Sequence, residues 1–286
     1  MRRSPLAALV LTVLLLVAPG AARAAVPDRT ATPAADAASV LAGVRTPGTA
    51  WGIDPATGRM AVTVDDTVAP TELTALRAVA ERAGALLRRE PGTLRPLIAA
   101  GQGIYGGGAR CSLGANVRSG STYYVVTAGH CTAAASTWYA DSAQTTVLGT
   151  RTATSYPTND YGLIRYTSRI AHPSAVYTHP GLITVYGAGN AYVGQAVCRS
   201  GTTTGVRCGT VTALNQTVNY ATGVIYGLIR TNICAEPGDS GGPLYVAATG
   251  TILGILSGGT GNCTAGGTTY YQPILEVLAA YGLTIP

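Results

Sequence analysis

The sequence predicts a mainly β protein with a smaller α+β segment ahead of it. Thirty of the 37 glycines lie in residues 98–286. That region also contains short runs rich in Val, Ile, Thr and Tyr, which turn residues separate about every ten positions. Because these runs are too short and too closely spaced for helical crossovers, we expect a β-sandwich or a β-barrel.

The N-terminus has the three parts of a secretory signal peptide. Two arginines follow Met1, residues 6–18 form an apolar stretch, and Ala22-Arg23-Ala24 is a small-x-small cleavage sequence. We expect residues 1–24 to be removed after Ala24. The apolar stretch is too short to span a bilayer and no second one follows, so the sequence predicts a secreted, extracellular product without a membrane anchor.

Residues 25–97 have a different composition from the rest of the chain. They contain no cysteine and hold eight arginines and eight acidic residues. Apolar residues at near-helical spacing predict a helix over residues 71–89, which Pro91-Gly92 ends. The composition break near residue 97 indicates a small α+β pro-region that is removed from the mature domain. The alternative is an N-terminal domain that stays attached.

The predicted elements of residues 98–286 are short strands and one helix. The apolar and β-branched runs 123–127, 161–166 and 251–256 predict strands. Residues 272–281 predict a C-terminal helix, because Pro273 lies in its first turn and Gly282 follows it.

The formal charge of +6 does not indicate a nucleic-acid partner. All 19 basic residues are arginine, and three of them lie in the leader. Residues 25–97 are neutral, and residues 98–286 hold eight arginines against five acids. Because these arginines form no run or stripe, we expect no binding to nucleic acid.

All six cysteines follow residue 110, and an even number in an exported chain predicts disulfides. Sequential pairing would give Cys111–Cys131, Cys198–Cys208 and Cys234–Cys263. A zinc site is disfavoured because there is no CxxC pair and the only adjacent histidine is His130. No calcium-binding loop is evident either, so we expect no cofactor or metal.

A serine between glycines is the candidate nucleophile. In the string Gly238-Asp239-Ser240-Gly241, the glycines let the backbone approach a substrate closely. The amides of Gly238 and Ser240 are candidate donors to the oxyanion of an attacked carbonyl. On its own, the Gly-x-Ser-x-Gly pattern also fits the nucleophile elbow of α/β-hydrolases, or a tight glycine turn.

Chain order separates these possibilities. An α/β-hydrolase needs its histidine after the serine, but all three histidines precede Ser240: His130, His172 and His179. No acidic residue lies between positions 98 and 130, so an acid-His-Ser order could use only Asp141 or Asp160 with one of the two later histidines. The order His-Asp-Ser is supplied by His130, Asp160 and Ser240.

The surroundings of each residue favour this triad. His130 ends the apolar run 123–130 beside Cys131, which predicts a rigid position at a strand end. His172 and His179 each precede a proline and are predicted to lie in loops. For the acid, Asp160 directly precedes the predicted strand 161–166. By contrast, Asp141 lies in a polar segment and Asp239 is adjacent to the nucleophile itself.

Three separate strings, TAGHC at 127–131, NDYG at 159–162 and GDSGGP at 238–243, resemble the chymotrypsin-like serine proteases. The chain is most similar to the streptogrisins, the secreted bacterial branch that includes alpha-lytic protease. This resemblance implies two antiparallel six-stranded β-barrels with the triad in the cleft between them. It places the N-terminal barrel at 98–185 and the C-terminal barrel, with a short C-terminal helix, at 186–286.

The resemblance also implies a role for each matching residue. His130 is the base, Asp160 the acid that orients it, and Ser240 the nucleophile. Ser257 supports the acid, and Arg199 pairs with Asp239. The residues implied to contact the substrate are Ala235, Glu236, Pro237, Leu256, Ser257, Gly258 and Gly259. The pro-region, residues 25–97, would assist folding and then be removed by the enzyme itself between Leu97 and Ile98.

The resemblance further predicts the substrate side chain that is preferred before the scissile bond. Leu256 stands where streptogrisins that favour large apolar side chains have a small residue. Glutamate-specific relatives have a histidine at this place, and this chain does not. It also has no aspartate at the pocket floor. We therefore expect an apolar pocket narrowed by Leu256, which takes Leu, Met or a smaller aliphatic at least as well as Phe or Tyr.

The predicted protein is a monomeric secreted serine endopeptidase whose partners are polypeptide substrates and its own pro-region. After export it would have no membrane contact. Two alternatives remain from the sequence: a catalytically silent binding module on the same fold, and a hydrolase of esters or cell-wall peptides. In having the cysteine pair Cys198–Cys208, the chain resembles alpha-lytic protease, whereas several streptogrisins lack this pair.

Overall fold

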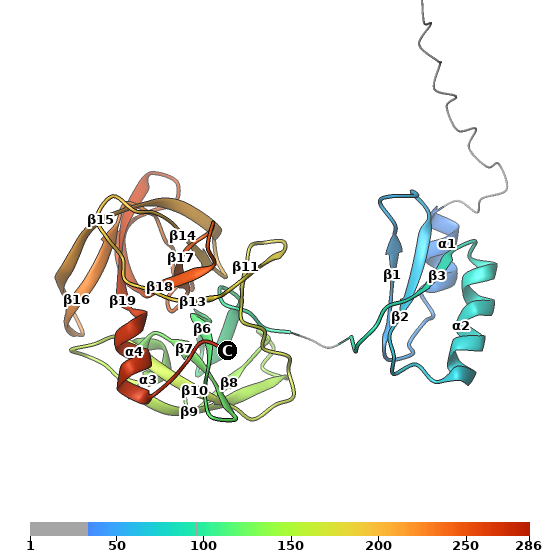
Figure 1. Ribbon diagram of the computed structural model, residues 1–286, viewed down its shortest axis with the longest axis horizontal. Helices are drawn as coiled ribbons and strands as arrows, with labels where there is room; N and C mark the ends of the chain where they lie inside the picture. Colours follow the sequence, from blue (N-terminus) through green and yellow to red (C-terminus); the bar gives the residue numbers. More distant parts are fainter. Residues whose placement is uncertain (1–33, 95–96) are drawn as a thin grey trace, which may run out of the picture. The chain divides into compact units, whose positions relative to one another are not determined.

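The computed structural model describes residues 34–94 and 97–286 (Figure 1). The predicted signal peptide and its cleavage site at Ala24 lie outside the described residues. The chain divides after Leu94 into two compact units, a small N-terminal one and a larger β-rich one. The boundary predicted after Leu97, and the division of the larger unit at residue 185, stay predictions.

The N-terminal unit is an α+β structure in which two helices cover a three-stranded sheet. The sheet has the order β1-β2-β3, with β1 and β2 antiparallel and β2 and β3 parallel. A small core of Leu41, Val62, Val64, Leu76 and Ala80 lies between the layers. The elements are α1 (Ala34–Leu41), β1 (Thr49–Ile53), β2 (Met60–Val64), α2 (Pro70–Arg82) and β3 (Leu86–Arg89).

The helix predicted over residues 71–89 is too long, because α2 ends at Arg82. Gly84 follows with a φ of +60°, a left-handed conformation that ends a helix and that glycine adopts without strain. Residues 86–89 then pair with β2 as a strand. The pattern of leucines fits both structures, so periodicity alone did not separate the last turn from the strand.

The first half of the larger unit forms one antiparallel sheet with the order β5-β4-β8-β9-β10-β7-β6. Only Leu113 and Gly114 separate β5 from β6, so one continuous segment forms both edges of the sheet. Counted as one strand, that segment closes a barrel of six, as expected. The strands are β4 (Gly103–Gly106), β5 (Ala109–Ser112), β6 (Ala115–Ser119), β7 (Thr122–Thr127), β8 (Thr137–Tyr139), β9 (Val147–Ser155) and β10 (Tyr161–Tyr166).

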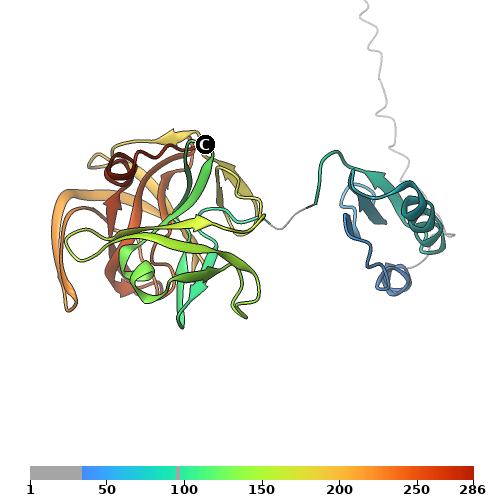
Figure 2. The same cartoon turned by 90° about the horizontal axis from the view of Figure 1, so that it is seen from below.

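The second half forms a sheet with the order β13-β18-β17-β14-β15-β16-β19, and β18 also pairs with β19. That extra pairing closes six strands into a ring, with the two-residue β13 beside it. The long β15–β16 hairpin, coloured orange, lies at one edge of this unit (Figure 2). The strands are β13 (Gly187–Ala188), β14 (Ala196–Gly201), β15 (Gly205–Tyr220), β16 (Gly223–Thr231), β17 (Pro243–Val246), β18 (Thr251–Asn262) and β19 (Gly266–Pro273).

Two helices and a small hairpin complete the unit. α3 (Gly129–Ala134) follows β7, and α4 (Ile274–Tyr281) ends the chain before Gly282, which has a φ of +59°. The hairpin of β11 (Ala175–Tyr177) and β12 (Leu182–Thr184) lies on the segment between the two sheets. No helix in residues 34–94 or 97–286 is both long and apolar enough to cross a membrane.

The three disulfides expected from sequential pairing are present: Cys111–Cys131, Cys198–Cys208 and Cys234–Cys263. The first joins β5 to α3, and the second links directly opposed residues of β14 and β15. The third joins the segment after β16 to the end of β18. Each bond therefore fixes a loop or strand pair within the β-rich unit.

Candidate active site

His130 lies where β7 ends and α3 begins, and it is held by a carboxylate from the neighbouring strand. Its Nδ1 lies 2.8 Å from Asp160 Oδ2, and its backbone N–H donates to Asp160 Oδ1 at 2.8 Å. These two contacts fix the ring and the main chain together. The imidazole side chain is 30% exposed, so its other nitrogen can be reached from solvent.

Asp160 is 1% exposed and is hydrogen-bonded to two side chains of the second sheet as well. Ser257 Oγ on β18 donates to Asp160 Oδ2 at 2.6 Å. The backbone N–H of Asp160 donates to Gln272 Oε1 on β19 at 2.9 Å. The buried side chain therefore accepts from donors of both halves of the unit, the His130 amide and the Ser257 hydroxyl.

The loop from Pro237 to Gly242 leaves two alternate amides, those of Gly238 and Ser240, without an acceptor in the described residues. The amides of Asp239, Gly241 and Gly242 donate to Glu236, Leu256 and Asp239 carbonyls at 3.0, 2.8 and 3.0 Å. Those of Gly238 and Ser240 donate to no atom of the described residues. Two such N–H groups beside a serine hydroxyl can donate hydrogen bonds to a developing oxyanion.

Two of the three glycines of this loop hold a backbone that other residues rarely adopt. Gly238 has a φ of +100°, and a Cβ there would lie 2.6 Å from Arg110 Nε. Gly241 has a φ of +84°, and a Cβ there would meet the Thr127 hydroxyl and lie 2.6 Å from the Ser112 carbonyl oxygen. Both positions therefore require glycine for conformation and for space.

Asp239 forms a buried ion pair beneath the loop. Its Oδ2 lies 3.2 Å from Arg199 Nη2, and both side chains are fully buried. Oδ1 also accepts the amides of Thr203 and Thr204 at 2.9 and 3.1 Å. Burial lowers the pKa of Arg199, and the charge of Asp239 opposes that shift. The ion pair thus fixes the backbone next to Ser240. Neither Asp239 nor Arg199 takes part in the hydrogen bonds that hold His130.

Ser240 and His130 both lie near Cys131 Sγ, and no hydrogen bond joins their side chains. His130 Nε2 lies 3.6 Å from Cys131 Sγ, and that sulfur is 4.0 Å from the Ser240 carbonyl oxygen. Catalytic contacts of this kind often tighten only when substrate binds. Cys111, His130 and Cys131 cluster as metal ligands would, but the disulfide occupies both sulfurs.

A cavity of about 290 Å³ opens beside Ser240. Its walls combine the segment before the nucleophile with β18: Ala235, Glu236, Pro237, Ser240, Leu256, Gly258, Gly259 and Gly261. Glu236 is held in this wall, because its Oε1 accepts the amide of Cys263 at 2.9 Å. Leu256 is 2% exposed and also packs against the core of the second sheet.

A second cavity, of about 380 Å³, borders His130. Tyr156 and Tyr220 line it, and the ring of Tyr156 stands edge-on to His130 at 6.0 Å. The Tyr156 hydroxyl is hydrogen-bonded to Thr222, which spans the gap between the two sheets. Sequence reasoning missed these residues and Gln272, since only folding brings the loop before Asp160 onto the β15–β16 hairpin.

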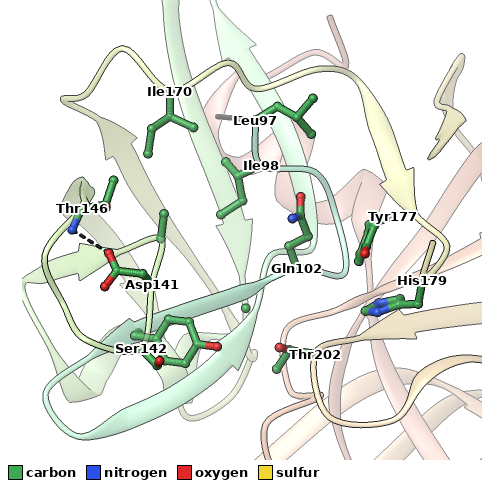
Figure 3. Close-up of a pocket in the computed structure, with 13 residues that line it drawn as sticks. Leu97, Ile98, Gln102, Asp141, Ser142, Thr146, Ile170, Tyr177, His179 and Thr202 are labelled. Atoms are coloured by element: carbon green, nitrogen blue, oxygen red, sulfur yellow. Dashed lines mark hydrogen bonds between the residues drawn. The ribbon is translucent and has the colours of Figure 1, made fainter. Parts of the chain in front are cut away.

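The two other histidines lie away from Ser240. His172 stacks on Tyr166 at a centroid distance of 4.4 Å. His179 lines a third cavity, of about 570 Å³, whose lining also includes Asp141 (Figure 3). Hydrogen bonds from the backbone of Thr145 and Thr146 lower the pKa of Asp141 to about 2.

Comparison with known proteins shows which family this chain belongs to. A family model described as Trypsin matches residues 107–280, and one described as alpha-lytic protease prodomain matches residues 29–84. The chain belongs to the trypsin family of serine proteases. It is a serine endopeptidase preceded by an alpha-lytic protease prodomain, and its two barrel-like sheets form the chymotrypsin-like fold.

Similar proteins span both parts of this trypsin-family chain. Streptogrisin-A of Streptomyces griseus is 48% identical over 255 residues, which cover 88% of this chain and 82% of that protein. Streptogrisin-D of the same organism is 50% identical over 243 residues, 84% of this chain and 61% of its own length. A solved glutamic acid-specific serine protease that uses a histidine triad in substrate binding is 45% identical with a TM-score of 0.63. The match covers 66% of this chain and 100% of the solved protease chain.

Proposed function

We propose that this trypsin-family chain is a secreted endopeptidase that uses His130, Asp160 and Ser240 as its triad. The observation that carries the proposal is the set of hydrogen bonds from Ser257 through Asp160 to His130. That set presents Nε2 of a fixed imidazole near Ser240, whose own amide and that of Gly238 donate to no atom of the described residues. A Ser-His-Asp triad with an oxyanion site hydrolyses amides by acyl transfer.

In this mechanism, Ser240 Oγ attacks the carbonyl carbon of the scissile bond and gives its proton to His130 Nε2. Asp160 holds the ring through Nδ1 and stabilises the imidazolium that forms. The amides of Gly238 and Ser240 donate to the oxyanion of the tetrahedral intermediate. His130 then protonates the leaving amine, the C–N bond breaks, and an acyl-enzyme remains. Water, deprotonated by the same imidazole, hydrolyses the ester and restores Ser240.

The cavity beside Ser240 supports an apolar preference before the scissile bond. Its lining includes three glycines, Ala235, Pro237 and Leu256, and its one acidic side chain is engaged with the amide of Cys263. None of the three histidines lines it, and in that respect the cavity differs from a site that binds glutamate through histidines. We propose that Leu256 narrows it toward Leu, Met and smaller aliphatic side chains.

Removal of the pro-region between Leu97 and Ile98 fits the way this segment is placed in the β-rich unit. Leu97 is 43% exposed, whereas Ile98 is 2% exposed and joins the core. The Ile98 amide donates to the Ala171 carbonyl at 2.8 Å, and Asn116 Nδ2 donates to the Ile98 carbonyl at 2.9 Å. Ile98 is thus integrated into the mature domain while the preceding residue is accessible.

Intact mass and N-terminal sequencing of secreted wild type and Ser240→Ala test the proposal. Wild type is expected to begin at Ile98 and the variant to retain its pro-region. A fluorophosphonate should label wild type at Ser240, which a silent binding module would not permit. Turnover of an ester without turnover of a matched amide would favour the esterase alternative. A secreted Ser240→Ala protein that also begins at Ile98 would contradict self-cleavage.

A further inference from the structure

The strand β5 runs beside the loop that carries the nucleophile. Ser112 donates from its backbone to the Ser240 carbonyl at 2.7 Å and from its Oγ to the Gly238 carbonyl at 2.9 Å. Two residues earlier on β5, Arg110 Nη2 donates to the Pro237 carbonyl at 3.3 Å. Residues 110–112 therefore follow residues 237–240 along one flank of the site.

A second flank of the loop is formed by β18. The Gly241 amide donates to the Leu256 carbonyl at 2.8 Å, and the Leu256 amide donates to Gly242 at 2.9 Å. The cavity beside Ser240 lies on this flank. If the acyl half of a substrate occupies that cavity, the leaving half must extend the other way, over β5. This step rests on the proposed function.

Arg110 is the charged side chain on the β5 flank. It is exposed, and its Nε would lie 2.6 Å from a Cβ placed on Gly238, so its guanidinium lies beside the backbone of the nucleophile loop. Arg110 forms no salt bridge within residues 34–94 and 97–286. The nearby Asp239 carboxylate is buried and already paired with Arg199. The positive charge of Arg110 is thus available to a ligand.

We propose that Arg110 is a specificity-determining residue that favours an acidic side chain among the first two residues after the scissile bond. Two extended residues span roughly 7 Å, a distance that an arginine side chain can cover. A guanidinium matches a carboxylate in shape and can bind it through two parallel hydrogen bonds. The substrate class is therefore a polypeptide with an apolar residue before the cut and Glu or Asp shortly after it.

The test uses internally quenched peptides that share the same acyl half and carry Glu, Gln or Lys at the first or the second position after the cut. A chromogenic anilide with the same acyl half has no residue on the leaving side and measures any wider damage to the site. The mature enzymes compared are wild type, Arg110→Gln, Arg110→Lys and Arg165→Gln. Arg165 is an exposed arginine of β10 and controls for loss of one positive charge.

At low ionic strength, wild type should cleave the Glu peptide roughly two- to fivefold better in kcat/KM than the Gln peptide at one of the two positions, the size of an exposed ion pair. Arg110→Gln should bring that ratio to about one, Arg110→Lys should keep part of it, and Arg165→Gln should keep all of it. Added salt should shrink the wild-type ratio because screening weakens exposed charges.

Three results would overturn the inference. An unchanged Glu-to-Gln ratio in Arg110→Gln would show that the charge does not reach the substrate. An equal loss of anilide and peptide turnover would mean that Arg110 only supports the Gly238 backbone. Failure of mature wild type to cleave any of these substrates would overturn the proposed function and this inference together. The first two results, with peptide cleavage intact, would leave the proposed function standing.

Discussion

Ser257 Oγ donates a 2.6 Å hydrogen bond to Asp160 Oδ2, and so joins β18 of the second sheet to the residue that precedes β10 of the first. The same carboxylate oxygen lies 2.8 Å from His130 Nδ1. The orientation of the proposed base is therefore set by contacts from both sheets. A change in either sheet can alter the geometry of the imidazole without touching the substrate.

Replacing Ser257 with alanine should lower kcat/KM roughly ten- to a hundredfold. A hydrogen bond to a charged group contributes about 1.5–3 kcal/mol, and Asp160 is too buried to recruit bulk water in its place. Steady-state kinetics on an anilide measure the change. Ser174→Ala is the control, because Ser174 bonds the Val185 carbonyl in a different loop. Ser257→Ala with wild-type kinetics would contradict a supporting role.

Replacing Arg199 with methionine should destabilise the mature domain by about 3–5 kcal/mol. Both Arg199 and Asp239 are fully buried, so the variant leaves an uncompensated carboxylate beneath the nucleophile loop. Urea unfolding of the mature enzyme, inactivated at Ser240 with a fluorophosphonate, measures the loss. Arg207→Met, which changes an exposed arginine on β15, should differ little from wild type. Equal unfolding of both variants would contradict the importance of the buried pair.

The substrates compared have Phe or Leu directly before the scissile bond. Replacing Leu256 with alanine should raise the ratio of their kcat/KM values, Phe over Leu, by roughly tenfold. The shorter side chain would widen the proposed specificity cavity, in whose wall Leu256 lies. Because Leu256 also packs in the second core, the variant loses stability as well, and the ratio of two substrates removes that effect.

Leu253→Ala is the matched control for this change. Leu253 belongs to the same core as Leu256 but does not line the cavity beside Ser240. The control should lose a comparable amount of stability and keep the wild-type substrate ratio. If both variants shift the ratio equally, the preference does not depend on the wall at position 256.

The sequence predicted the pieces of the site more fully than their surroundings. Chain order and local motif selected His130 and Asp160, and the two are in direct contact. The strands 123–127 and 161–166 were readable from their β-branched runs, and both are present as β7 and β10. Tyr156 and Thr222 carry no local signal, because their contact exists only after the two sheets have packed together.

The end of α2 shows a second limit of sequence reading. Leu87 continues the helical spacing, so a periodic pattern extends the helix through it. In the structure the helix ends before Gly84, and residues 86–89 pair in parallel with β2 as a strand. The strand depends on a partner more than twenty residues earlier in the chain, and periodicity within the segment does not contain that information.

The mature domain should lose stability as the pH falls below the usual range of histidine, and His179 should account for part of that loss. His179 Nε2 is buried without a hydrogen-bond partner in the described residues. Burial lowers the pKa of His179 below its ordinary value of 6.5; Asp239 opposes the shift, and Arg199 adds to it. The folded state therefore favours the neutral ring, and the unfolded chain binds a proton more readily.

The stabilisation by neutral His179 is complete well above pH 6.5 and is lost as the pH falls from there toward the lower pKa of the folded state. His179→Gln should weaken the pH dependence of unfolding across this window, since glutamine does not titrate. Urea unfolding of the fluorophosphonate-inactivated enzyme at pH 7.5 and pH 5.5 measures the difference for wild type and variant. His172→Gln controls for the loss of an imidazole, because His172 lies against Tyr166 and not in the cavity of His179. Identical pH dependence in wild type and His179→Gln would show that other groups cause the acid sensitivity.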